Sequence, residues 1–143
     1  MILGYMKHPD PLFVIIDGHA IIHRAYHALP PMTTKDGTVV HAVYGFASML
    51  MKVIETLHPT HIAVAFDVAG GTFRDEVFAD YKGTRKPADD DLYAQIPLVY
   101  ELVEAFGISI YTKQGYEADD VIGSVVKSLE KKKVHSIVVT GDK

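Results

Sequence analysis

The stretch LFVIID, residues 12–17, indicates most clearly which class of fold this chain adopts. Five apolar residues follow one another without polar alternation, and an aspartate ends the run. This pattern is typical of strands in a parallel sheet that is covered on both faces. Three more runs have the same character, namely HIAVAFD (61–67), ISIYT (108–112) and SIVVTGD (136–142).

Helical periodicity separates these runs. Apolar residues recur at steps of three and four over residues 42–58 and 96–106, and Gly107 is placed to end the second of these helices. A third apolar stripe of this kind covers residues 118–129. Strands that alternate with helices predict an α/β fold, in which a mainly parallel sheet is flanked by helices.

The composition is that of a globular chain. Its 143 residues are 48% hydrophobic and 22% charged, which predicts a single domain with a sizeable core. The chain has no cysteine, which excludes disulfides and cysteine-based metal sites. We expect no membrane partner, no signal peptide and a cytoplasmic location, because no apolar run approaches the length of a membrane span. Residues 1–11 are interpreted as an N-terminal extension of a domain at 12–143.

Residues 68–91, VAGGTFRDEVFADYKGTRKPADDD, fit neither the strand nor the helix pattern. Irregular connections of this length inside a compact domain are usually functional. Basic residues interleaved with aromatic ones suit a single-stranded or frayed nucleic acid, whereas the alternative is a solvated loop whose aromatic side chains pack inward. The candidate DNA-binding residues are Arg74, Lys82, Arg85 and Lys86.

Acidic residues follow three of the four predicted strands. Asp17 and Asp67 end their runs, and Asp142 follows the last run after Thr140 and Gly141. Ligands of open parallel sheets bind outside the carboxyl ends of the strands, so these side chains are expected at one edge. The remaining strand leads into GYEADDVIG (115–123), which adds three carboxylates near a helix start.

Carboxylates that converge without partners repel one another, and divalent cations relieve that repulsion. Oxygen ligands at this density favour Mg²⁺, with Mn²⁺ as a substitute. The predicted metal ligands are Asp17, Asp67, Glu117, Asp119, Asp120 and Asp142. The alternative for each is a helix cap or a turn without a metal.

Two further features bear on the ligand. Zinc is disfavoured, because His19, His23 and His27 are spaced by four but no supporting carboxylate motif accompanies them. The net charge of −4 does not exclude a nucleic acid. Six of the 18 acidic residues belong to the predicted site, so the rest of the chain has 12 acidic and 14 basic residues and is slightly positive.

With these residues in place, the chain resembles the first part of the 5′-nuclease domain of bacterial DNA polymerase I. That domain is related to flap endonucleases and has a PIN-like α/β fold. The resemblance covers nearly the whole chain from Phe13 onward. It is carried by IIDGHAIIHRAYHALPP, AVYGF, PTHIAVAFD, TFRDEVFADYKGTRKP, GYEADDVIG and VVTGDK.

The resemblance implies a Mg²⁺-dependent, structure-specific nuclease that cuts 5′ flaps or 5′ ends of DNA and removes RNA primers in replication and repair. It implies two Mg²⁺ ions on the six acids. It also implies that Arg24, Lys82 and Arg85 steer or polarise the scissile phosphate, and that residues 70–95 form an arch that threads the free 5′ end. A polymerase domain in the same parent chain is a further expectation.

The family pattern continues past TGDK with further acidic ligands and a helix-hairpin module. The resemblance therefore implies an N-terminal part of a larger nuclease or polymerase, with little or no cleavage by residues 1–143 alone. The alternative is a fragment that binds metal and DNA ends without cutting. A PIN-type endoribonuclease would explain the acids but not YKGTR, and an aspartyl phosphatase is disfavoured because DGH lacks a second aspartate.

Overall fold

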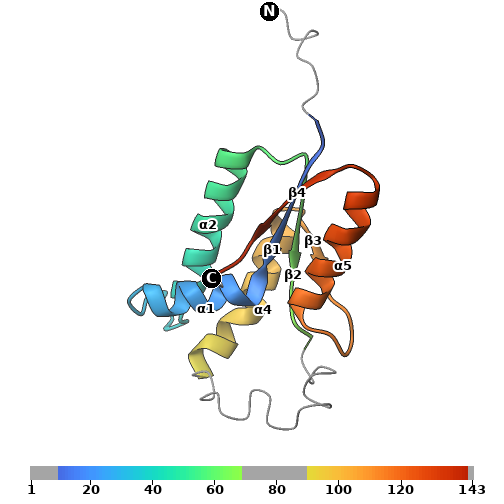
Figure 1. Ribbon diagram of the computed structural model, residues 1–143. Coiled ribbons are helices and arrows are strands. Elements are labelled where there is room, and N and C mark those ends of the chain that lie inside the picture. Colours follow the sequence, from blue (N-terminus) through green and yellow to red (C-terminus); the bar gives the residue numbers. More distant parts are fainter. Residues whose placement is uncertain (1–9, 69–89, 142–143) are drawn as a thin grey trace, which may run out of the picture.

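Strands alternate with helices through residues 10–68 and 90–141, which are the residues described by the structure, a computed structural model (Figure 1). In chain order the elements are β1 (Leu12–Asp17), α1 (Gly18–Ala28), α2 (His41–Leu57), β2 (His61–Ala65), α4 (Asp90–Ala105), β3 (Ser109–Tyr111), α5 (Ala118–Lys131) and β4 (His135–Val139). The predicted α/β class is confirmed.

All strand pairs are parallel, and the order in the sheet is β3-β2-β1-β4. β1 lies inside the sheet, so that Ile16 is level with Val64 of β2 on one side and with Val139 of β4 on the other. The prediction that strands are covered on both faces is correct for β1, which is buried from Phe13 to Asp17. It is wrong for the edge strand β4, where Val138 is 42% exposed.

Helices lie on both sides of the sheet (Figure 1), and alternate residues of β1 face these two helix layers. Val14 and Ile16 belong to a core cluster shared with α1, α2 and α4. Phe13 and Ile15 belong to a second cluster, which α5 covers. This period of two follows from the pleat of the strand and produces a three-layer arrangement with the sheet in the middle.

The helix predictions differ from the structure mainly at their ends. The helix predicted for 42–58 is α2, one residue earlier at each end. The helix predicted for 96–106 is α4, which begins earlier at Asp90, and Phe106 lies beyond its end and is 44% exposed. Gly107 has a φ of 72°, the left-handed conformation that favours glycine after a helix. Within the described residues, no helix has both the length and the hydropathy needed to cross a membrane.

The start of α2 is capped by a side chain from another helix. Val40 precedes α2 and has no polar side chain for this purpose. Instead, Gln95 of α4 accepts hydrogen bonds at Oε1 from the N–H groups of Ala42 at 2.7 Å and Val43 at 3.3 Å. Its Nε2 donates to the carbonyl of Asp91 at 3.0 Å. Gln95 is fully buried, so it joins α2 to α4 through satisfied polar groups inside the core.

Gly45 sets the distance between α1 and α2. A Cβ atom at this position would lie 2.6 Å from Cβ of Ala25 and 3.0 Å from Cδ1 of Leu29. We expect Gly45→Ala to lower the free energy of unfolding by about 1–3 kcal/mol, because the helices must move apart. Gly123→Ala in α5 is the matched control: a Cβ there meets nothing within 4 Å, and the change should stabilise the protein by about 0.5–1 kcal/mol. Urea unfolding of both variants measures the difference, and equal effects would contradict the close crossing.

Candidate metal and nucleic-acid site

Asp17 is the last residue of β1 and the N-cap of α1. Its Oδ1 accepts a hydrogen bond from the N–H of Ala20 at 3.2 Å, and its Oδ2 accepts one from the hydroxyl of Thr140 at 3.4 Å. The residue is only 5% exposed. A carboxylate is therefore held at the carboxyl end of the central strand by the first turn of α1 and by the residue after β4.

The environment of Asp17 disfavours its negative charge. The pKa of the Asp17 carboxyl is raised from 3.8 to about 6, chiefly by burial, and the hydrogen bond from Ala20 only partly opposes this rise. Asp119 contributes to this rise in pKa through its charge and a hydrogen bond, and Asp67 contributes through its charge. Asp17, Asp67 and Asp119 are thus close enough to interact, although they come from three different parts of the chain.

Asp67 links the end of β2 to the start of α5. It follows β2 after Phe66, and its Oδ1 accepts a hydrogen bond from the N–H of Ala118 at 2.6 Å. Its own N–H donates to Nδ1 of His19 in the first turn of α1 at 3.0 Å. One acidic residue thereby connects two helices of opposite layers at the same edge of the sheet.

Glu117 precedes the first turn of α5 and has an extended conformation, with φ −82° and ψ 163°. Its N–H donates to Oδ2 of Asp120 at 3.1 Å, and the two residues form a capping box. Glu117 is 6% exposed. The three acids of this helix start therefore differ in their contacts: Asp119 interacts with Asp17, whereas Glu117 and Asp120 interact with each other.

Asp120 also lines a groove of about 530 Å³ between β3 and α5. Tyr111, Lys113 and Tyr116 line the same groove, and Nζ of Lys113 lies 4.6 Å from the centre of the Tyr116 ring. The cation–π contact draws the Lys113 charge to this aromatic ring.

In the described part of the chain, no three carboxylate or imidazole groups form a cluster that could hold one metal ion. The donor set nevertheless fits a hard divalent cation, since it consists of carboxylates whose mutual repulsion contributes to the raised pKa of Asp17. Asp142 lies outside the described residues, so the convergence of all six predicted ligands remains a prediction.

Arg24 is the predicted phosphate contact that the structure describes. It is exposed on α1 and lines a groove of about 480 Å³ together with Ser48 of α2 and Thr140 after β4. The other predicted DNA-binding residues, Arg74, Lys82, Arg85 and Lys86, lie outside the described residues, as do residues 70–89 of the predicted arch. Residues 90–95 of that segment belong to α4.

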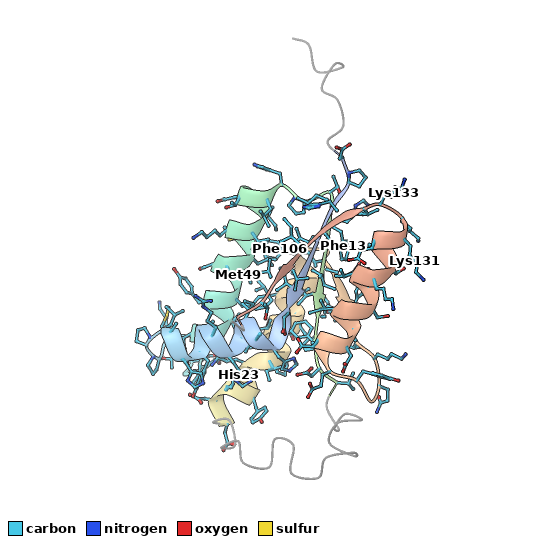
Figure 2. All side chains as sticks on the ribbon, viewed as in Figure 1. Phe13, His23, Met49, Phe106, Lys131 and Lys133 are labelled. Carbon is cyan, nitrogen blue, oxygen red and sulfur yellow. The ribbon has the colours of Figure 1, made fainter. Side chains whose placement is uncertain are left out.

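The three histidines considered for zinc do not share one environment. His19 contacts Asp67, whereas the rings of His23 and His27 stack on each other with centroids 6.5 Å apart. His23 lies on α1, while Lys131 lies at the C-terminal end of α5, opposite the end that carries Asp119 and Asp120 (Figure 2).

The sequence pattern does not identify two residues of the site, His19 and Thr140. It indicates His19 only as a disfavoured zinc ligand and Thr140 only as a residue between the last apolar run and Asp142. No signal in the sequence pairs His19 with Asp67, because they are 48 residues apart. Thr140 is 123 residues from the Asp17 side chain to which it donates.

Comparison with known proteins shows which family this chain is similar to. A family model described as 5′-3′ exonuclease, N-terminal resolvase-like domain, matches residues 12–143. DNA polymerase I of Bacillus subtilis is 45% identical over 130 residues, which are 91% of this chain and 15% of that protein. DNA polymerase I of Caldicellulosiruptor bescii is 43% identical over 130 residues, again 91% of this chain and 15% of that protein. The chain thus spans a small part of these relatives.

Solved structures support the fold. A bacteriophage T5 5′-exonuclease with bound zinc ions aligns with a TM-score of 0.70 and 20% identity, over 92% of this chain and 49% of that one. A T5 flap endonuclease variant in a pseudo-enzyme-product complex with DNA and metal ions aligns with a TM-score of 0.66 and 18% identity, over the same shares. At this identity the similarity concerns the fold alone. The match of the family model over residues 12–143 and the identity to the DNA polymerase I sequences show that this chain belongs to the 5′-3′ exonuclease N-terminal, resolvase-like domain family.

Proposed function

We propose that the protein containing this chain is a divalent-cation-dependent nuclease that acts on DNA 5′ ends and 5′ flaps. The observation that carries the proposal is the buried Asp17 carboxyl at the carboxyl edge of the sheet, whose pKa is raised to about 6 in part by the charges of Asp119 and Asp67. Family membership supports the 5′-3′ direction. We further propose that RNA primers are among the substrates and that the protein acts in the cytoplasm, where bacterial DNA is replicated.

We assign Mg²⁺ as the cation and Mn²⁺ as its substitute, because the candidate ligands are all carboxylates. Metal ions are bound in the T5 neighbours named above, zinc in one of them, which supports a divalent cation at this site. The ligands are proposed to be Asp17, Asp67, Glu117, Asp119, Asp120 and Asp142. Bound cations of this kind supply activation of water and neutralise charge that develops on a phosphate.

The protein groups have separate tasks in this proposal. The hydrogen bonds from Thr140 and from the start of α1 fix the orientation of the Asp17 carboxylate, which is proposed to bind the cation. The capping box of Glu117 and Asp120 orients the first turn of α5, and with it Asp119. Arg24, Lys82 and Arg85 are proposed to place positive charge next to the scissile phosphate, where negative charge accumulates. No protein nucleophile is required.

Metal binding should be visible as a stabilisation that depends on pH. Without metal, the folded protein retains a proton on Asp17 between about pH 4 and pH 6 that the unfolded chain has released, so this group's contribution to stability falls as the pH rises. A cation binds the deprotonated carboxylate. We therefore expect Mg²⁺ or Mn²⁺ at about 100 times its Kd to raise Tm by about 5–10 °C at pH 7.5 and by much less at pH 5.

The control for this measurement is Asp119→Asn, which keeps the size of the side chain but removes a charge next to Asp17. The rise in Tm should become smaller in this variant. A metal-induced shift of the same size in Asp119→Asn, or one that does not change between pH 5 and pH 7.5, would contradict the proposed site.

The direct test of the function is cleavage. In a chimera, this chain replaces the 130 matched residues of Bacillus subtilis DNA polymerase I, so that the rest of a relative is present. The chimera should cut a labelled 5′-flap DNA in Mg²⁺ and stop when EDTA is added. A flap that begins with ribonucleotides tests the primer assignment. Binding of the flap without cleavage in Mg²⁺ would favour a DNA-end-binding module instead.

A further inference from the structure

His19 makes a contact that the metal and DNA assignments do not use. Its Nδ1 accepts a hydrogen bond from the backbone N–H of Asp67 at 3.0 Å, and the same atom lies 3.8 Å from Oδ2 of that residue. The two side chains are 21% and 29% exposed, respectively. Because Nδ1 acts as an acceptor, the neutral ring carries its proton on Nε2.

The residue before Asp67 is also held tightly. The ring of Phe66 stacks on Tyr100 with centroids 4.2 Å apart, and His19 meets it edge to face at 5.6 Å. Gly18 leaves the space for this ring, since a Cβ there would lie 2.4 Å from it. The N–H of Phe66 donates to the carbonyl of Tyr111 at 3.0 Å.

These contacts explain how Asp67 keeps a defined conformation although β2 has already ended at Ala65. Asp67 lies beyond the last residue of β2, so its N–H does not take part in the hydrogen bonds between strands. His19 supplies the acceptor instead. The carboxylate is then anchored through Oδ1 to the N–H of Ala118. Main chain and side chain are restrained from α1 and α5, one on each side of the sheet.

We propose that His19 is a positioning residue for Asp67: it holds the backbone of Asp67 so that the carboxylate meets Asp17 and the start of α5 in the geometry a cation needs. The proposal rests on the proposed function for its metal-binding part. His19 acts here through Asp67 and not as a metal ligand, since its Nδ1 accepts the Asp67 N–H and Nε2 of the neutral ring then carries the proton. Partners of this type typically change metal affinity 10–100-fold.

The test uses the 143-residue chain and three variants at this position. His19→Asn places an amide oxygen close to where Nδ1 stood, so the Asp67 N–H retains an acceptor. His19→Gln places the same group one bond farther away, and His19→Ala removes it. His27→Ala, an exposed histidine at the other end of α1, is the control. Mn²⁺ affinity is measured by electron paramagnetic resonance, and exchange of the Asp67 amide by NMR without metal.

We expect His19→Ala to weaken Mn²⁺ binding about 10–100-fold and to speed exchange of the Asp67 amide. His19→Asn should stay within about threefold of the original affinity and keep the amide protected, while His19→Gln should resemble alanine. His27→Ala should change neither quantity. If His19→Ala does not fold, the comparison of His19→Asn with His19→Gln tests the proposal, because both side chains are polar and differ only in where the acceptor lies.

Two results would overturn the proposal. One is unchanged Mn²⁺ affinity and amide exchange in His19→Ala. The other is equal loss in asparagine and alanine variants, which would mean that the imidazole itself is needed. If the unmodified chain binds no Mn²⁺, the proposed metal site fails, and the amide exchange of Asp67 alone decides whether His19 holds its backbone.

Discussion

Replacing Asp119 by alanine is expected to lower Mg²⁺-dependent flap cleavage by the chimera at least about 100-fold. Asp119 is the acid of α5 that interacts with the buried Asp17 carboxyl, so it joins the helix start to the central strand. Loss of a residue that only supports a metal ligand costs about 10–100-fold, and loss of a direct ligand should cost more. Single-turnover cleavage of a labelled flap measures the effect, with substrate binding measured separately in Ca²⁺.

The matched control is Glu130→Ala, an exposed acid in the last turn of the same helix. This substitution should leave the cleavage rate within about twofold of the original rate, since changes at exposed residues away from the site have small effects. Asp120→Ala should also abolish cleavage, while Asp120→Asn should recover part of it, because asparagine retains an acceptor for the Glu117 N–H. Cleavage by Asp119→Ala at the original rate would remove this residue from the proposed ligand set.

Replacing Gln95 by leucine is expected to cost about 3–5 kcal/mol of stability. The leucine leaves the N–H groups of Ala42 and Val43 without their acceptor in a buried helix start, and each such group costs about 1–3 kcal/mol. This is a large part of the 5–15 kcal/mol that stabilises a typical domain. Denaturant unfolding followed by circular dichroism measures the loss.

Two variants separate the lost hydrogen bonds from other effects of this change. Gln114→Leu makes the same substitution at an exposed loop residue and should change stability by less than about 0.5 kcal/mol. Gln95→Glu keeps an oxygen acceptor at the α2 start and should be destabilised less than leucine when its carboxyl is protonated at low pH. A loss below 1 kcal/mol in Gln95→Leu would show that the α2 start does not depend on α4.

The sequence alone was sufficient for the fold class and for the family resemblance. Continuous apolar runs at 12–17 and 61–67 predicted interior parallel strands because both faces of such strands exclude water. The position of Asp17 and Asp67 at one edge followed from the direction of those strands. These signals are local, since each depends on the order of residues within a few turns or one strand.

The tertiary structure decided what surrounds each acid. Asp17 has a raised pKa because it is buried and because Asp119 and Asp67 bring negative charge near it. His19 meets Asp67 across 48 residues, and Gln95 caps α2 across 53. The edge position of β4, which leaves Val138 exposed, also depends on the order of strands. Burial and long-range hydrogen bonds result from how helices pack on both faces of the sheet, so no local pattern in the sequence records them.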